Sequence, residues 1–456
     1  MFSRRLKKGY FALEGLNSFA TVFFFYYFYF YMQKSFGFEN KANLMLAALN
    51  GGTYALVVWF AGRFAQTRGY FTALKLGYAT MIAALGMGLV VRSATGHVGV
   101  MVLTVVGMSF TWPTLEALVS EGEHREGLQH MVGVYNVVWA ATAAVGSFSG
   151  GAMLEKLGLA SLFYVPMSIH VVQLCLTLWL QSQANPPGPG NPRTAPVQAN
   201  GNQASANNRW SDDSNQPAFP NRNLQQLQGV TIAGAALEQP ALAERQELVE
   251  PTTLALSGTE VRPETQHSIP KARRFLRMAW LANPFAYIAI NTLIAVVPGV
   301  ARRLDLSTMA AGFCCSLWCF VRLGAFAALW QWRGWHYKFR WLLLAYLGLA
   351  ASFGAIVLAP NVPTLLVGQV IFGGAVGLIY YSSLFYSMDR SETKGEHGGI
   401  HEAAIGLGNF AGPAVGAATL QLIPQYSQSG TIAVIVLLLC GLGGLVRIWY
   451  GTNKSV

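Results

Sequence analysis

The chain has 456 residues, of which 53% are hydrophobic, 12% are aromatic and only 11% are charged. A soluble globular protein carries about 25% charged residues, so this chain has too little polar side-chain surface to face water on all sides. The composition therefore excludes an ordinary soluble domain and favours a protein embedded in a lipid bilayer.

Apolar stretches long enough to cross a bilayer follow one another along the chain. A hydrocarbon core of about 30 Å needs roughly 20 helical residues at a rise of about 1.5 Å each. A backbone inside lipid must satisfy its own hydrogen bonds, so we expect each stretch to be a helix. The twelve expected spans are residues 10–32, 43–61, 72–91, 97–119, 129–153, 159–181, 277–299, 307–330, 340–359, 363–387, 400–421 and 429–450.

The net charge of +11 is distributed in a way that favours a membrane over a nucleic-acid partner. Basic residues gather at the two termini and in alternate loops, which is the positive-inside pattern. The apolar run after the basic N-terminus is too long for a signal peptide and lacks a small-residue cleavage site, so we expect a retained first helix. We expect a multi-pass protein of a bacterial inner (plasma) membrane, with both termini cytoplasmic and no nucleic-acid partner.

All five cysteines, Cys175, Cys314, Cys315, Cys319 and Cys440, fall inside the expected spans. Cys315 and Cys319 share a helix face, which is compatible with a soft-metal site. Small buried hydrophobic side chains are the simpler interpretation, because no Met or His cluster lies beside them. We expect no metal, no cofactor and no disulfide framework.

Residues 183–273 differ in texture from the rest, because they are rich in Asn, Gln, Pro, Ala and Ser and show no sustained periodicity. Such a segment cannot bury enough apolar surface to fold, so we expect a disordered cytoplasmic linker. It separates six spans from six. The predicted domains are an N-terminal six-helix bundle at 1–182, the linker at 183–273 and a C-terminal six-helix bundle at 274–456.

The two halves carry the same polar signatures at matching places. EHREGLQHMVGVYN begins at Glu123 and EHGGIHEAAIGLGN begins at Glu396, so both read E-H, eight residues and then G-x-x-N. Further matches at a similar offset pair Asn17 with Asn291, Gln66 with Gln331, and Glu116 with Asp389. Six spans return the chain to its starting side, so the repeats are expected to run parallel, about an axis along the membrane normal.

Outside the linker, the chain with these features resembles the major facilitator superfamily. The loop at 62–69, G-R-F-A-Q-T-R-G, is similar to that family's G-x-L-A-D-R-x-G motif. Gln66 replaces the acidic residue and Thr67 the basic one, so an amide-based hydrogen bond would have to replace the family's charged latch. The resemblance implies an all-α integral membrane fold, with twelve transmembrane helices in two six-helix bundles related by pseudo-twofold symmetry.

A second motif resembles one from the same family, but it gives weaker evidence about function. The run Gly408-x-x-x-Gly412-Pro413-x-x-Gly416 is similar to the Gly-Pro motif of the family's antiporters, but it lies in the opposite half of the chain. Antiport is therefore not inferred from it. Its physical content is that glycine at every fourth position lets helices approach closely.

Arg322 is the clearest candidate for a functional residue. It lies about nine residues, or roughly 13 Å, from the cytoplasmic end of its span, and ionisable groups at such a depth are costly. One interpretation is a site for an anionic solute group, because a guanidinium binds carboxylate or phosphate. The alternative is a structural hydrogen-bond hub between the spans at 129–153 and 307–330. Both interpretations stay open at this point.

Four amides and two tyrosines complete the predicted solute site. The family's architecture implies that Asn136 approaches Arg322 and that Asn409 approaches Thr53 or Tyr54 across the seam between the bundles. It also places Asn17 and Asn291 on cavity-lining helices. Tyr380 and Tyr381 are candidates for contact with a flat or amphipathic solute. The alternative for the amides is a structural role, in which they form hydrogen bonds between packed helices. The alternative for the tyrosines is a position at the membrane–water interface, where aromatic residues are enriched.

The polar signatures that occur in both halves predict a pair of gates on the cytoplasmic side, one from each half. They would close the cavity when it faces outward. The predicted gate residues are Gln66, Arg68, Gln331, Arg333, Glu123, His124, Glu396 and His397.

Proton coupling needs a titrating group, and the candidates are Glu14, Glu116 and Asp389. Glu14 lies only a few residues inside its span, so an interfacial, permanently ionised carboxylate is the alternative. Glu116 and Asp389 lie at span ends near Arg125 and Arg390, where solvated salt bridges are the alternative.

The sequence thus predicts a secondary-active or facilitative transporter that moves a small organic solute, with a preference for an anionic one, by alternating access. The alternative is a membrane sensor or assembly factor that keeps this fold without transport. No nucleotide-binding motif G-x-x-x-x-G-K-[ST] is present, and no enzyme is expected. The expected partners are the solute, the lipid bilayer and protons, and the expected state is a monomer.

Overall fold

A computed structural model describes residues 4–121, 125–184, 269–332, 334–390 and 394–451. Only the backbone is described at 4–5, 125–129, 132, 269–270, 388–390 and 394–404. The predicted linker at 183–273 falls almost wholly outside these ranges, as do Glu123, His124 and Arg333. Every regular element within the described ranges is a helix, as the sequence predicts.

The helices follow the expected spans in order, with ends that extend beyond the apolar cores. The bounds are α1 Arg4–Phe36, α2 Asn40–Arg68, α3 Tyr70–Val90, α4 Ala94–Ser120, α5 Arg125–Lys156, α6 Ser161–Ala184, α7 Ile269–Arg303, α8 Thr308–Cys315, α9 Leu317–Gln331, α10 Phe339–Val357, α11 Val362–Arg390, α12 Lys394–Leu422 and α13 Ser429–Gly451.

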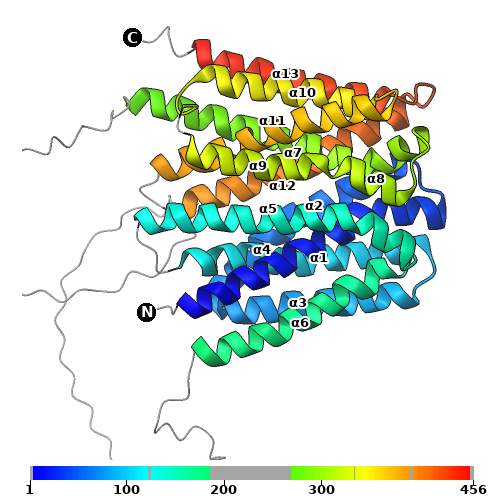
Figure 1. The fold of residues 1–456 in the computed structure, drawn as a ribbon, viewed down its shortest axis with the longest axis vertical. Coiled ribbons are helices and arrows are strands. Elements are labelled where there is room, and N and C mark those ends of the chain that lie inside the picture. The colour runs from blue at the N-terminus through cyan, green and yellow to red at the C-terminus, as the bar shows by residue number, and fades with distance from the viewer. Residues whose placement is uncertain (1–3, 122–124, 185–268, 333, 391–393, 452–456) are drawn as a thin grey trace, which may run out of the picture.

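Figure 1 shows the helices in two groups, with α1–α6 in the lower half and α7–α13 in the upper half. The start of α1, the end of α6, the start of α7 and the end of α13 all lie at one end of the molecule, on the left of the view. Each group therefore begins and ends on the same side. This is the arrangement that two parallel repeats of six spans require.

Within the described residues, ten stretches are long and apolar enough to cross a bilayer. The helices α1 and α12 are not among them, although they have 33 and 29 residues. The sequence explains the difference, because α1 carries five tyrosines with Glu14 and Asn17, while α12 contains seven glycines. Both helices contribute polar groups to the central cavity described below, Glu14 and Thr21 from α1 and Asn409 from α12.

The span expected at 307–330 is not one helix. Ser316 separates α8 from α9, and its Oγ donates to the carbonyl oxygen of Phe313 at 3.2 Å. Gln369 of α11 is fully buried and accepts a hydrogen bond from the backbone N of Trp318 at 3.3 Å. A side chain thus takes the place of a helical carbonyl, as broken membrane helices require.

Glycines set the distance between α12 and α7, as the spacing in the sequence predicts. A Cβ atom added to Gly412 would lie 2.6 Å from the carbonyl oxygen of Ile288, and one added to Gly408 would lie 2.6 Å from the Cβ of Tyr287. Gly416 faces Leu44 of α2 instead. The glycine run therefore serves close packing, both within the C-terminal group and toward the N-terminal one.

The two groups meet along two seams, and both were predicted. In one, α2 packs on α12, with Gly51 against the backbone of Asn409. In the other, α5 packs on α8 and α9, with Gly151 against Gly312 and the ring of Trp139 6.2 Å from that of Phe326.

The seams are bridged by polar contacts at the end of the molecule away from the termini. Glu155 Oε2 accepts from Met309 N at 2.9 Å, and Lys41 Nζ donates to Gln421 Oε1 at 2.9 Å. A longer ion pair of 3.7 Å joins Arg302 to Glu39. This end of the bundle pair is therefore closed in the present conformation.

The cysteines only partly follow the expectation of buried hydrophobic side chains. Cys315 and Cys319 are buried, whereas Cys175 and Cys440 are exposed on the outside of the bundle. An exposed position on a membrane-spanning helix faces lipid, which accommodates a cysteine as readily as the protein interior.

Candidate functional site

A cavity of about 160 Å³ lies between the two groups of helices. Its walls come from α1, α2, α4 and α5 on one side and from α7, α9, α11 and α12 on the other. It is lined by Glu14, Thr21, Val22, Phe25, Tyr26, Tyr29, Asn50, Tyr54, Met108, Trp112, Glu116, Tyr135, Trp139, Tyr287, Ile290, Asn291, Ile294, Arg322, Tyr380, Ile405 and Asn409.

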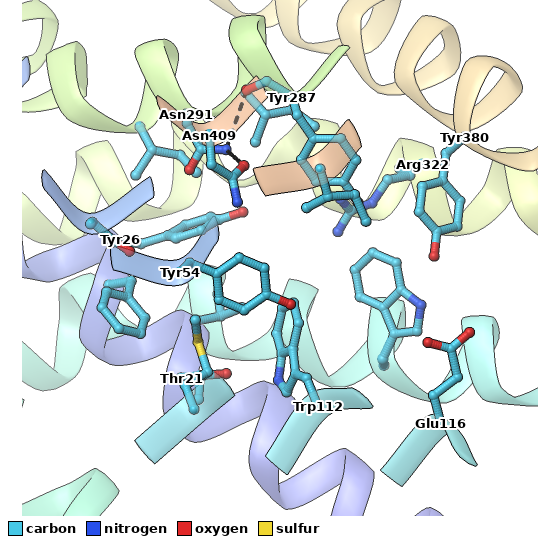
Figure 2. A pocket seen from close by; sticks show the side chains of 18 of the residues that line it. Thr21, Tyr26, Tyr54, Trp112, Glu116, Tyr287, Asn291, Arg322, Tyr380 and Asn409 are labelled. Carbon is cyan, nitrogen blue, oxygen red and sulfur yellow. Dashed lines mark hydrogen bonds between the residues drawn. The ribbon is translucent and has the colours of Figure 1, made fainter. Parts of the chain in front are cut away.

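Figure 2 shows the two walls facing each other. Asn291, Asn409 and Arg322 lie on the wall from the C-terminal group, whereas Trp112 and Glu116 lie on the opposite wall. Glu116 is four residues from the end of α4, at the end of the molecule that carries the termini. The cavity therefore extends toward that end, away from the closed one.

Arg322 is held between aromatic rings. Its Cζ lies 4.5 Å from the ring centre of Trp139 and 4.7 Å from that of Trp318. The side chain is 6% exposed, and within the described residues its Nε has no hydrogen-bond partner. Two indole faces stabilise the cation, and they leave N–H groups for an acceptor in the cavity.

The predicted contact of Asn136 with Arg322 is indirect. Asn136 Oδ1 accepts from Trp139 Nε1 at 2.9 Å and from the hydroxyl of Tyr380 at 3.3 Å. Trp139 then lies under the guanidinium of Arg322. The hydrogen bond from Tyr380 crosses the seam between α5 and α11, so Asn136 links the two groups of helices beside the cavity.

Asn409 forms a hydrogen bond with Asn291 of α7, a partner that the sequence did not predict. Its Oδ1 accepts a short hydrogen bond from Asn291 Nδ2, which also donates to the carbonyl oxygen of Tyr287 at 3.2 Å. The reason is helix rotation, because the backbone of Asn409, not its side chain, faces α2 at Gly51. Both amides line the cavity as a pair from one wall.

Two of the three proton-coupling candidates line the cavity. Glu14 is 1% exposed and accepts from Ser18 Oγ at 2.7 Å, so it is buried rather than interfacial. Glu116 is half-buried on the facing wall. Asp389 lies in the last turn of α11, where only the backbone is described.

Three predicted solute-site residues are not among those that line the cavity: Asn136 lies beside it, and Asn17 and Tyr381 lie farther away. Asn17 is fully buried in the N-terminal group, and its carbonyl oxygen accepts from Thr21 Oγ1 at 2.7 Å. Tyr381 packs against Phe326 and Trp335, with ring centres at 6.1 and 5.9 Å. Neither side chain reaches the cavity wall in this conformation.

The predicted gate residues that the structure describes lie at helix ends on the side of the termini. Gln66 and Arg68 are exposed at the end of α2, and Gln331 is exposed at the end of α9. Glu396 and His397 lie in the first turn of α12, where only the backbone is described. Glu123, His124 and Arg333 are outside the described residues.

The sequence predicted Tyr380 but missed most of the other aromatic residues of the site. Trp112, Trp139 and Tyr287 line the cavity but were not among the candidates. The sequence alone offers little indication of their role, because an aromatic residue in an apolar span is equally compatible with packing between helices and with contact to lipid. Tyr26 shows the same ambiguity, since it lines the cavity while its neighbour Tyr27 donates to the carbonyl oxygen of Ser147.

The comparisons with known proteins agree with this geometry. The sequence profile described as Major Facilitator Superfamily matches residues 11–390. The chain belongs to the Major Facilitator Superfamily. No curated protein matches the sequence.

Solved structures of members with this architecture superpose over nearly the whole chain. The crystal structure of the nucleoside transporter NupG covers 98% of this chain and 98% of its own, with a TM-score of 0.59 and 11% identity. The structure of a NupG mutant covers 98% and 99%, with a TM-score of 0.61 and 11% identity. At this identity the likeness shows the fold alone. The superfamily and the fold together identify an integral, multi-pass membrane transporter.

Proposed function

We propose that this superfamily member moves a small organic solute with a negative charge through the central cavity by alternating access. The observation that carries the proposal is a cavity lined from both groups of helices, with Arg322 on its wall. A solute held between two bodies couples its own passage to their relative rocking. The bodies are residues 1–182 and 274–456, joined by the linker at 183–273.

The asymmetry of the seams supports alternating access. Cross-seam contacts close the end away from the termini, while the cavity extends toward the other end. With both termini in the cytoplasm of a bacterial cell, this conformation faces inward across the inner membrane. The gate residues Gln66, Arg68 and Gln331 lie at the end that carries the termini, and we propose that the paired gates meet there when the cavity faces outward. The transporter acts as a monomer, because each chain contains both walls of its cavity.

Arg322 supports an anionic solute. A guanidinium that is only 6% exposed is ordinarily paired with a carboxylate. The guanidinium of Arg322 is instead stabilised by the indole rings of Trp139 and Trp318. Its N–H groups, including the unpartnered Nε–H, are suited to donate hydrogen bonds to a carboxylate or phosphate oxygen. Glu14, buried at the same cavity, is the group through which a proton would accompany the solute.

Replacing Arg322 by Gln tests the charge preference. In a thermal-shift screen of small metabolites on the purified protein, we expect organic anions to stabilise the parent and to lose this effect in Arg322→Gln. The matched control is Arg92→Gln, which removes one positive charge from an exposed loop. Equal stabilisation of parent and Arg322→Gln by the same anions would contradict an anion site at Arg322.

Uptake into proteoliposomes tests transport itself. We expect an anion that stabilises the parent to enter vesicles containing the parent at a rate at least about tenfold above empty vesicles, and to enter Arg322→Gln vesicles at the background rate. Binding without uptake in the parent would instead support the alternative of a sensor that keeps the transporter fold.

A further inference from the structure

We infer that the solute of this cavity is a planar aromatic monoanion, with one ring and a carboxylate or an equivalent acidic group. This inference rests on the proposed function, because it specifies the solute that Arg322 would bind. It adds that the rest of the solute is flat and unsaturated.

The lining of the cavity is the first observation. Nine of its 21 residues are aromatic, whereas aromatic residues make up 12% of the chain. They come from both walls, with Tyr26, Tyr54 and Trp112 on one side and Tyr287 and Tyr380 on the other. Leu, Ile and Val would pack equally well against an apolar solute. An apolar solute alone therefore does not account for so many aromatic residues in the lining. Aromatic walls select rings, because offset-stacked and edge-to-face contacts stabilise a ring beyond the area that it buries.

The position of Arg322 is the second observation. Its guanidinium is flanked by Trp139 and Trp318, and the ring of Tyr26 stacks on that of Trp318 with an interplanar angle of 16°. Trp318 is buried behind the wall, whereas Tyr26, Trp139 and Arg322 line the cavity, so the cation lies among ring faces at the cavity wall. A carboxylate that bonds the guanidinium brings an attached ring beside these faces. An acid on a saturated, puckered ring would make the same ionic contact without the stacking.

The size of the cavity is the third observation. Its volume of about 160 Å³ is close to that of an engineered apolar cavity of about 150 Å³ that binds benzene. One six-membered ring therefore fills most of the space. The Asn291–Asn409 pair adds an Nδ2 and an Oδ1 that the hydrogen bond between them does not use, so a polar ring substituent would find a donor and an acceptor.

Three probes of matched size separate the parts of this inference. Benzoate is planar and anionic, cyclohexanecarboxylate is anionic but not aromatic, and benzamide is planar but uncharged. Binding is measured on the purified full chain in lipid nanodiscs, by titration calorimetry. We expect benzoate to bind roughly three- to tenfold more tightly than cyclohexanecarboxylate, which is the range that aromatic contacts add. We expect benzamide to bind more weakly than either anion.

Two cavity variants and one control locate the effect. Trp112→Leu and Tyr26→Leu each remove one ring from the wall, and each should lower the preference for benzoate over cyclohexanecarboxylate at least twofold without abolishing binding of either anion. Trp179→Leu is the matched control, because Trp179 is 55% exposed on the outside of α6. Its preference should equal that of the parent. Thermal midpoints without ligand show whether each variant is folded.

The outcomes separate this inference from the proposed function. Equal affinity for the two anions, lost in Arg322→Gln, would overturn the aromatic class and leave an anion transporter. Benzamide binding as tightly as benzoate would overturn the anionic part of both. Failure of all three probes to bind at millimolar concentration would overturn the inference of a single-ring anion, whereas uptake of another anion would still support the proposed function.

Discussion

Arg322 shows how a single charge is tolerated far from water in this protein. The sequence offered two interpretations, a solute site and a structural hub between α5 and α8–α9. The structure combines parts of both, because Trp139 of α5 stacks on the guanidinium while the residue lines the cavity. The ring faces lower the cost of burial without using the N–H groups, which a buried carboxylate partner would have used.

Glu14 is the residue that we expect to take up the coupled proton. If it takes up the coupled proton, Glu14→Gln removes the titrating group but keeps an oxygen that accepts the hydrogen bond from Ser18. We expect the variant to exchange labelled for unlabelled solute across vesicles within about twofold of the parent. We expect it to lose pH-driven accumulation, because no proton accompanies the solute.

Glu116→Gln is the control, since Glu116 lines the same cavity from α4. It should retain accumulation driven by a pH gradient. Accumulation by Glu14→Gln at the level of the parent would show that the coupling proton is carried elsewhere.

Among the helices, the two that are too polar or too glycine-rich for an apolar span, α1 and α12, both line the cavity. The helix α1 is rich in tyrosine and α12 in glycine, and neither is apolar enough to register as a span by hydropathy. Polar and small residues cost little at these positions, because α1 and α12 face protein and a cavity over part of their surface. The glycines of α12 also determine how closely it approaches α7.

Gly412→Ala tests this packing. The added Cβ would lie 2.6 Å from the carbonyl oxygen of Ile288, a fixed backbone atom, so α12 must move away from α7. We expect a loss of stability of about 1–3 kcal/mol, which is typical of overpacking, and a lower thermal midpoint in detergent.

Gly324→Ala is the matched control for this substitution, because nothing lies within 4 Å of the Cβ position at Gly324 in α9. A helical alanine there should leave the thermal midpoint unchanged or slightly raised. Equal midpoints for the two variants would contradict close packing between α12 and α7.

At the scale of the whole molecule, the closed end is held by contacts that are easily broken. Glu39 and Arg302 are 75% and 61% exposed, and the contact of Lys41 with Gln421 is also exposed. Exposed ion pairs contribute little to stability, so their loss would allow the two bodies to separate at this end. Gly151 and Gly312 pack closely against each other beneath these contacts. They contribute van der Waals contact and no side-chain hydrogen bond, because glycine has no side chain.

A cross-link across this end tests the rocking motion. Lys41→Cys together with Gln421→Cys, joined by a cleavable thiol reagent with a short spacer, should hold the end closed. We expect uptake to fall at least about tenfold and to return when the reagent is cleaved. The single variants Lys41→Cys and Gln421→Cys, treated with the same reagent, should keep the uptake of the parent. Uptake that survives complete cross-linking would exclude a path through this end.

Composition and internal repeats were enough to predict the membrane environment, the order of the helices, the two parallel halves and the superfamily. These properties depend on composition and on repeats along the chain, and both survive any rotation of a helix about its axis. It also named Arg322, Asn291 and Glu14 as candidates, and all three line the cavity.

Only the tertiary structure decided which side chains face that cavity. Asn17 and Asn291 are equivalent in the repeat, yet one is sealed in the N-terminal group and the other lines the cavity. Asn409 forms a hydrogen bond with Asn291, which the sequence did not predict, and Ser316 interrupts a span that was predicted to be continuous. In a helix that is apolar on all sides, periodicity does not report orientation, so rotation and breaks are set by packing against neighbouring helices.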